Sequence, residues 1–198
     1  MAEGASWLAL AEPRFATALA LTGDLPLRLR ADGFAALLDA IVSQQVSVAS
    51  ARAIWARLEA AGLTEASRVS AASQDDLRGC GLSRPKIRYA LGVARADIDY
   101  AALRTLPDAA VVNTLVQLPG IGSWTAEIYA MFSLGRADVF AHGDLALQEA
   151  ARRLFELSER PSEKQMRAMA APWSPWRSVA ARILWAYYRV STAREGIK

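Results

Sequence analysis

Cysteine and histidine are almost missing from this chain. Its 198 residues include one cysteine, Cys80, and one histidine, His142. A single cysteine excludes an intrachain disulfide, and the two residues are too few for a Cys/His zinc site or a four-cysteine iron–sulfur cluster. We therefore expect no required cofactor and no iron–sulfur cluster. Because a reducing compartment is the natural setting for such a chain, we expect a cytoplasmic protein.

Long apolar runs and β-branched runs are also lacking. No uncharged stretch is long enough to span a bilayer, and the N-terminal segment lacks the basic start of a secretion signal, so we expect no membrane partner. Alanine is abundant, which favours helix over strand. Apolar residues recur at helical spacing, and this pattern predicts eight to ten short helices and no strand. Residues 73–76 and 162–165 have the spacing of capping boxes, and residues 192–198 have the composition of a frayed tail.

The charge balance is mildly basic. The formal net charge is +3, and the sequence pI is near 9.3. This balance suits a polyanionic partner, but arginine-rich surface helices on an ordinary soluble protein would produce the same value. Charge alone leaves both interpretations open.

The most informative short motif is Leu-Pro-Gly-Ile-Gly at residues 118–122. Its two glycines let the backbone adopt positive φ and approach another molecule closely. A helix is expected to begin directly afterwards, and the N–H groups at a helix start bind anions such as a DNA phosphate. An ordinary turn between two antiparallel helices has the same Gly-x-Gly spacing, so the motif alone does not decide.

Residues 118–126, followed by Asp144, resemble the helix-hairpin-helix DNA glycosylase superfamily, and within it the 3-methyladenine DNA glycosylase II group. The resemblance extends over about residues 34–187. Its other segments are residues 41–47, 82–86, 138–144 and 173–178, with Trp185 further on. Five segments in the same order are more specific than any one motif.

The resemblance implies an all-α, two-lobed fold with the active site in the cleft between the lobes. It implies a single domain over residues 1–198. One lobe, at about 33–135, would carry the hairpin, and about 1–32 plus 136–198 would form the other. It further implies a monomer that binds double-stranded DNA, flips out alkylated bases and hydrolyses their N-glycosidic bonds in base excision repair. The alternatives are a glycosylase for another lesion and a non-catalytic DNA-binding module.

Asp144 is the catalytic residue that the resemblance implies. A fixed carboxylate beside the sugar stabilises the positive charge that develops as the glycosidic bond breaks. An aspartate directly before an amphipathic helix is also typical of an N-cap, and the two roles are compatible. Asp138 is the rival, but its place six residues earlier favours a structural role. Bifunctional relatives carry a lysine two residues after the second hairpin glycine, whereas Trp124 stands here, which predicts hydrolysis without a lyase step.

The resemblance also implies the residues around the flipped base. Trp124 and Trp185 would line the base pocket, with Tyr129 as a weaker candidate. An indole face attracts a cationic alkylated base with about 0.5–2 kcal/mol. Core packing is the alternative for these tryptophans.

The DNA contacts implied by the resemblance lie in two segments. Gln45 stands where relatives insert a wedge into the stack, although a solvated loop glutamine is the alternative. The backbone carbonyls of Val116, Leu118 and Ile121 would hold a monovalent cation that bridges to a phosphate. The full set of expected DNA-binding residues is Gln44, Gln45, Leu118, Gly120, Ile121, Gly122, Ser123 and Thr125.

Overall fold

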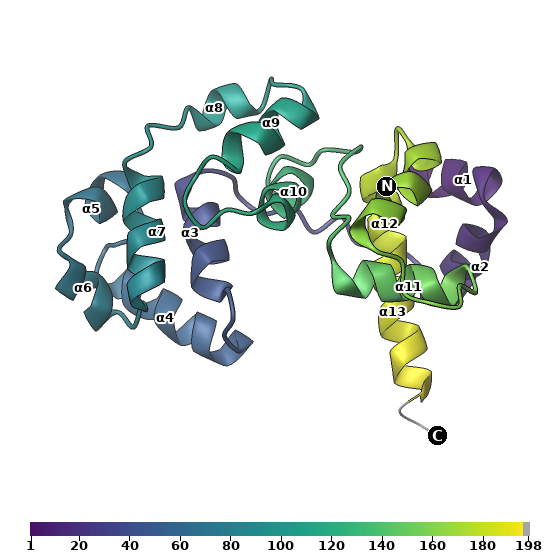
Figure 1. Ribbon diagram of the computed structural model, residues 1–198, viewed down its shortest axis with the longest axis horizontal. Helices are drawn as coiled ribbons and strands as arrows, with labels where there is room; N and C mark the ends of the chain where they lie inside the picture. The colour runs from purple at the N-terminus through teal and green to yellow at the C-terminus, as the bar shows by residue number, and fades with distance from the viewer. Residues whose placement is uncertain (196–198) are drawn as a thin grey trace. The chain divides into compact units, whose positions relative to one another are not determined.

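The computed structural model describes residues 1–195 and consists of helices joined by short loops (Figure 1). Over these residues there are thirteen α-helices, one 3-10 helix and no strand, which confirms the all-α expectation. The α-helices outnumber the predicted eight to ten partly because the shortest of them contain too few residues to show a repeat. In chain order the elements are α1 (Ala2–Ala11), α2 (Pro13–Thr22), α3 (Phe34–Ser43), α4 (Val48–Ala60), α5 (Ala66–Ala71), α6 (Gln74–Gly79), α7 (Arg84–Ala94), α8 (Tyr100–Leu103), α9 (Asp108–Leu115), α10 (Ser123–Phe132), α11 (Leu145–Leu154), α12 (Glu163–Ala170), η1 (Ala171–Trp173) and α13 (Arg177–Glu195).

The chain divides into two compact units. The hairpin unit contains Arg30–Tyr129, and the terminal unit contains Met1–Leu29 together with the chain from Ala130 onward. The second junction falls inside α10, whereas sequence reasoning placed it at the helix break near Gly135. No helix within residues 1–195 is long and apolar enough to cross a membrane.

The hairpin unit is organised around α7. This helix packs against α3, α5 and α6, and its buried face includes Ile87 and Leu91. Pro85 lies in its first turn, where a missing backbone N–H costs nothing. The capping box expected at residues 73–76 is confirmed at the start of α6, where Ser73 and Asp76 bond each other's backbone N–H groups.

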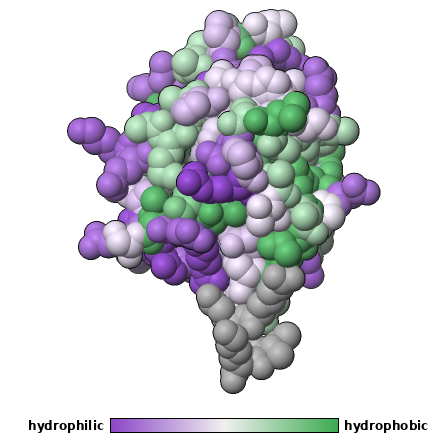
Figure 2. All heavy atoms as spheres, turned by 90° about the vertical axis from the view of Figure 1, so that its right-hand side faces the viewer, coloured by the Kyte–Doolittle hydropathy of each residue, from purple (hydrophilic) through white to green (hydrophobic). Residues whose placement is uncertain are grey.

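The terminal unit is organised around α13, which packs against α1, α2 and α11. The same unit contains an aromatic cluster of Phe15, Phe140, Phe155 and Trp173, with neighbouring ring centroids 5.1–6.0 Å apart. Helix α13 continues to Glu195, so residues 192–195 are helical and not the expected frayed tail, while 196–198 lie outside the described residues. On the face of this unit seen in Figure 2, hydrophobic side chains form small patches between hydrophilic ones.

Candidate functional site

Two aspartates lie in the connector between α10 and α11, and their surroundings differ. The Asp138 carboxylate accepts two hydrogen bonds from the Arg177 guanidinium, both at 2.8 Å, and one from the Ser174 hydroxyl at 2.7 Å. Burial raises the pKa of Asp138, but the hydrogen bonds from Arg177 and Ser174 outweigh it and leave the pKa below its ordinary value. Asp138 therefore anchors the connector to the start of α13, in agreement with the structural role expected for it.

Asp144 is the N-cap of α11. Its Oδ1 accepts a hydrogen bond from the Leu147 backbone N–H at 2.9 Å and another from the Trp185 indole N–H at 3.2 Å. The first bond is the capping interaction that the sequence suggested, and the second fixes the carboxylate from α13. Both donors meet at one oxygen of a half-buried side chain, which holds the carboxylate in one orientation.

The turn before Asp144 is also held in place. The Asp144 N–H donates to the Ala141 carbonyl at 3.0 Å, and the Gln148 side-chain amide donates to the His142 carbonyl at 3.0 Å. His142 lies in this loop and is buried, with its ring 5.2 Å from the Phe140 ring. One backbone bond and one side-chain bond thus hold the turn that precedes Asp144.

The indole of Trp185 packs against Phe132, which in turn contacts Arg182, within the terminal unit. Its ring lies 5.7 Å from the Phe132 ring, and the Arg182 guanidinium lies 4.2 Å from the centre of the Phe132 ring. Arg182 donates to the Met131 carbonyl at 3.2 Å, and burial, followed by the nearby charge of Arg28, lowers the pKa of Arg182. Trp185, expected as a wall of the base pocket, is therefore placed beside the candidate carboxylate by packing on one side and a hydrogen bond on the other.

The motif at residues 118–122 forms a tight turn between α9 and α10. The Ile121 N–H donates to the Leu118 carbonyl at 3.1 Å, and Gly120 has a φ of 79°. A Cβ at Gly120 would come within 2.4 Å of the Tyr89 ring, so glycine is required both by the conformation and by this close approach. Leu118 and Ile121 point into the hairpin unit, whereas Gly122 is exposed.

The loop between α3 and α4 is fixed to this turn. The Gln44 side-chain amide donates to the Gly120 carbonyl at 2.9 Å, so Gln44 is directed at the hairpin. Gln45 is exposed and adopts a left-handed backbone with a φ of 54°, while Val46 and Val48 present apolar side chains to solvent. Of the two glutamines expected to contact DNA, the structure thus places Gln45 on the outside and gives Gln44 an internal contact.

The remaining predicted residues lie on α10. Ser123 and Trp124 are exposed on its first turn, with 45% of Trp124 accessible, and Thr125 is buried. Tyr129 is 4% exposed, and its hydroxyl accepts a hydrogen bond from the Gly33 N–H at 2.8 Å. Burial is the main cause that raises the pKa of Tyr129. This tyrosine contacts the start of α3, while Trp124 is exposed on the hairpin unit.

The expected cation site consists of backbone carbonyls on the same turn. Carbonyl oxygens are the donors that hard cations prefer, and the Leu118 carbonyl uses one of its two lone pairs for Ile121. The donor type therefore fits a monovalent cation, together with the carbonyls of Val116 and Ile121. Across residues 1–195 no group of three or more His, Cys, Asp or Glu side chains is placed to hold a metal ion.

Sequence reasoning missed three residues of α7 that position these elements. Lys86 is 9% exposed, and its ammonium donates to the Val42 carbonyl at 2.7 Å, just before the α3–α4 loop. Burial lowers the pKa of this lysine. Tyr89 and Gly92 contact Gly120 and Pro119 of the turn. The spacing of Lys86, Tyr89 and Gly92 at three-residue intervals was the available signal, because such residues share one side of a helix.

A two-glycine turn between α9 and α10, followed by a capping carboxylate at the next helix start, defines a helix-hairpin-helix protein. A family model described as HhH-GPD superfamily base excision DNA repair protein matches residues 38–175. The chain belongs to the HhH-GPD superfamily of base excision DNA repair proteins.

Solved structures are similar over nearly the whole chain. DNA-3-methyladenine glycosidase of Bacillus halodurans has a TM-score of 0.85 and 31% identity, with 95% of this chain and 89% of that chain covered. The Schizosaccharomyces pombe 3-methyladenine DNA glycosylase Mag1, solved in complex with abasic DNA, has a TM-score of 0.78 and 26% identity, with 92% and 95% covered. YfjP of Bacillus subtilis is 33% identical over 114 residues, or 56% of this chain, and the chain spans only 40% of the length of that curated relative.

Proposed function

We propose that this protein is a monofunctional DNA glycosylase that removes alkylated bases from double-stranded DNA by hydrolysis. The observation that carries the proposal is the Asp144 carboxylate, whose Oδ1 is held by the Leu147 N–H and the Trp185 indole N–H. The similar proteins from Bacillus halodurans and Schizosaccharomyces pombe are a DNA-3-methyladenine glycosidase and a 3-methyladenine DNA glycosylase, which supports an alkylated purine as the substrate.

The proposed reaction requires one ionised carboxylate in a fixed orientation beside the sugar. As the N-glycosidic bond lengthens, the sugar becomes an oxocarbenium-like cation, and an ionised carboxylate beside it stabilises that charge and orients the attacking water. An alkylated purine already carries positive charge, so it leaves as a neutral base without a strong general acid. A single well-held carboxylate is therefore sufficient for this class of substrate.

The absence of a lyase step is supported by the positions of the lysines. The chain has three, Lys86, Lys164 and Lys198, and none stands beside the hairpin turn in sequence. A Schiff base requires a free neutral amine, whereas the Lys86 ammonium donates to the Val42 carbonyl. Position 124, two residues after the second hairpin glycine, is occupied by tryptophan. We therefore expect an abasic site and an intact strand as products.

The decisive experiment replaces Asp144 with asparagine, which keeps a good N-cap and removes the charge. The wild-type protein should release free 3-methyladenine from methylated duplex DNA. The variant should lose at least about 100-fold in rate, in line with the loss of one preorganised electrostatic group. Duplex binding should be retained.

The matched control is Asp99→Asn at the N-cap of α8. The Asp99 carboxylate accepts from the Ala102 N–H at 2.9 Å, so the same change is made at a helix start in the hairpin unit. It should leave base release unchanged. Release of uracil or 8-oxoguanine instead of alkylpurines would reassign the substrate, and wild-type protein that binds duplex DNA but releases no base would identify a non-catalytic module.

A further inference from the structure

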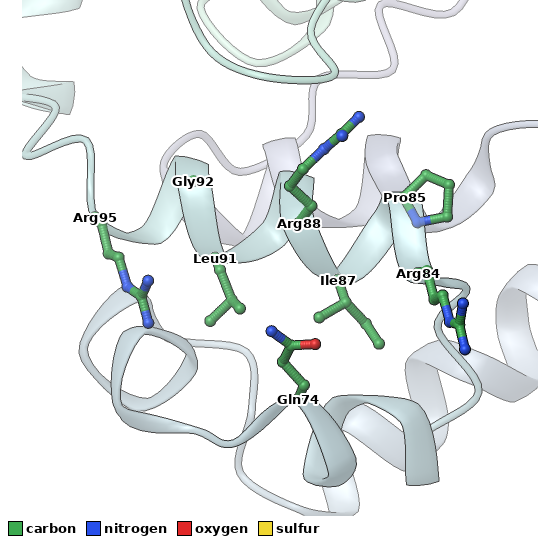
Figure 3. A pocket seen from close by; sticks show the side chains of 8 residues that line it. All are labelled: Gln74, Arg84, Pro85, Ile87, Arg88, Leu91, Gly92 and Arg95. Carbon is green, nitrogen blue, oxygen red and sulfur yellow. The ribbon is translucent and has the colours of Figure 1, made fainter.

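A row of arginines follows the exposed side of α7. Arg84, Arg88 and the C-cap residue Arg95 are spaced by four and seven residues, so their backbone positions lie along one side of the helix, while in Figure 3 the Arg84 and Arg95 side chains extend towards the side of Gln74 and Arg88 extends away from it. They border a pocket of about 570 Å³ between α7 and α6, and Figure 3 shows Gln74 facing α7 from the other side of this pocket. We call Arg84, Arg88 and Arg95 the arginine row.

The arginine row carries uncompensated positive charge. In the part of the chain that the structure describes, no carboxylate lies within ion-pair distance of these three guanidinium groups. Other arginines of the same unit do have partners, such as Arg104 with Asp32 at 2.7 Å. Like charges one helical turn apart repel each other by a few tenths of a kcal/mol, so a row of this kind is stabilised by an anion from outside.

The side chains remain available for such an anion. Arg84 and Arg88 are exposed, and the Arg88 guanidinium lies over the Tyr89 ring, 5.2 Å from its centre. Arg95 uses one of its five N–H groups, which donates to the Ser70 carbonyl at 3.3 Å. Each guanidinium therefore keeps the N–H fork that matches a phosphate.

The arginine row lies next to the part of α7 that supports the hairpin turn. Tyr89 contacts Gly120 and Gly92 contacts Pro119, and these two residues come one and four positions after Arg88 on α7. In Figure 3 the Arg88 side chain extends away from the side of α7 that faces Gln74. A nucleic-acid strand gripped at the turn would therefore continue along the same helix.

We propose that the arginine row is a second phosphate-binding track, which holds the DNA backbone beyond the phosphate bound at the hairpin turn. This inference rests on the proposed function, because it assumes that duplex DNA is bound at the turn. An acidic peptide is the less suitable occupant. The apolar residues of the pocket, Ile87 and Leu91, are buried against the unit and leave little surface for a peptide side chain.

The first test measures duplex binding by the full chain between 0.05 and 0.3 M salt. The logarithm of the association constant falls linearly with the logarithm of the salt concentration, and each lost phosphate contact makes this line less steep by about 0.9. The double variant Arg84→Gln/Arg88→Gln should therefore make the salt dependence less steep by about two and weaken binding about 10-fold near 0.15 M salt. Adding Arg95→Gln should have a smaller effect, because that side chain is partly engaged by Ser70.

The control removes the same number of charges elsewhere in the hairpin unit. Arg68→Gln/Arg78→Gln changes α5 and α6, where Arg78 is already paired with Asp75. An equal loss of slope in this control would show that total charge matters and would overturn the arginine row. Unchanged slope in the Arg84/Arg88 variant would also overturn it, even with base release intact, so the proposed function would survive that result.

The second test needs no protein variant. Neutral methylphosphonates are placed one at a time along the duplex, and binding of the wild type is measured at each position. We expect loss at the phosphate of the hairpin turn and at one or two phosphates further along, and the second group should become silent in the Arg84→Gln/Arg88→Gln variant. Loss at a single phosphate would contradict the track. Duplex binding with no salt dependence in the wild type would reject the proposed function itself.

Discussion

Helices α10 and α11 both begin at a tight turn, yet they use their first N–H groups differently. At α11 the Asp144 carboxylate caps the helix from within, through the Leu147 N–H. At α10 the preceding residue is Gly122, which has no side chain to cap with, and the first turn contains no acidic residue. The positive end of α11 is thus filled by the chain's own carboxylate, whereas we propose that an external anion fills the positive end of α10.

This difference separates two tasks. In the terminal unit, the helix start and the Trp185 indole orient the Asp144 carboxylate, to which we assign the chemistry as a proposal. In the hairpin unit, we propose that the turn at Gly120 and the exposed start of α10 offer backbone N–H groups to a phosphate, which would position DNA without reading its sequence. A capping side chain at the start of α10 should therefore weaken DNA binding and raise the free energy of unfolding.

The largest effect is expected when α10 is given the kind of cap that α11 has. A Cβ at Gly122 would meet no atom within 4 Å, so Gly122→Asp is sterically tolerated. The new carboxylate should weaken duplex binding about 10- to 100-fold by repelling the phosphate, and should raise the unfolding free energy by about 0.5–1 kcal/mol as an N-cap. Fluorescence anisotropy and thermal denaturation measure the two quantities.

Gly122→Asn is the matched control for that change. Asparagine caps a helix as well as aspartate does but carries no charge, so it should keep the gain in stability and most of the binding. If the two variants weaken binding equally, the loss comes from bulk at the turn, and the contrast between the two helix starts fails.

Local signals explain which parts of this arrangement could be predicted. The capping boxes at residues 73–76 and 162–165 were both predicted and are both formed, because each depends on residues three apart. The cap at Asp144 was likewise readable from its place before an amphipathic helix. The all-helical fold followed from apolar spacing, and the family followed from separated motifs.

The contacts that could not be predicted join distant parts of the chain. The Trp185 N–H reaches Asp144 across 41 residues, and the Lys86 ammonium reaches the Val42 carbonyl across 44 residues. No periodicity records such pairs, since they depend on how helices pack. For the same reason Gln44 and Gln45 were indistinguishable in the sequence, although one is tied to Gly120 and the other is exposed.

The second expected effect tests the support of the carboxylate from α13. Trp185→Phe keeps an aromatic ring and removes the indole N–H that Asp144 accepts. Because the carboxylate then depends on its own helix start alone, kcat for base release should fall about 10-fold, with KM changed less than about threefold. Single-turnover kinetics on methylated duplex measure both. A parallel fall in DNA affinity, with kcat intact, would show that Trp185 acts on binding and not on Asp144.

A smaller effect is expected in the hairpin unit, at the two adjacent glutamines. Gln44→Ala removes the hydrogen bond to the Gly120 carbonyl and should lower the unfolding free energy by about 1 kcal/mol. Gln45→Ala alters an exposed side chain and should change it by less than about 0.5 kcal/mol. Urea denaturation of the two variants is the measurement, and equal losses would mean that the Gln44 contact does not stabilise the turn.

The smallest effect concerns α11 beyond its cap. Hydrogen bonds from Arg152, and then from Arg153, lower the pKa of Glu149 from 4.5 to about 2. Since the folded pKa is the lower one, this stabilisation is complete above pH 4.5 and is lost as the pH falls towards 2. Exposure of the pair keeps the amount below about 1 kcal/mol. Glu149→Gln should therefore reduce the fall in melting temperature between pH 4.5 and pH 2. Glu163→Gln, which changes a more exposed pair with Arg167, should leave that fall closer to wild type. If the melting temperatures of wild type and Glu149→Gln fall equally over this pH range, the ion pairs of Glu149 with Arg152 and Arg153 do not stabilise α11.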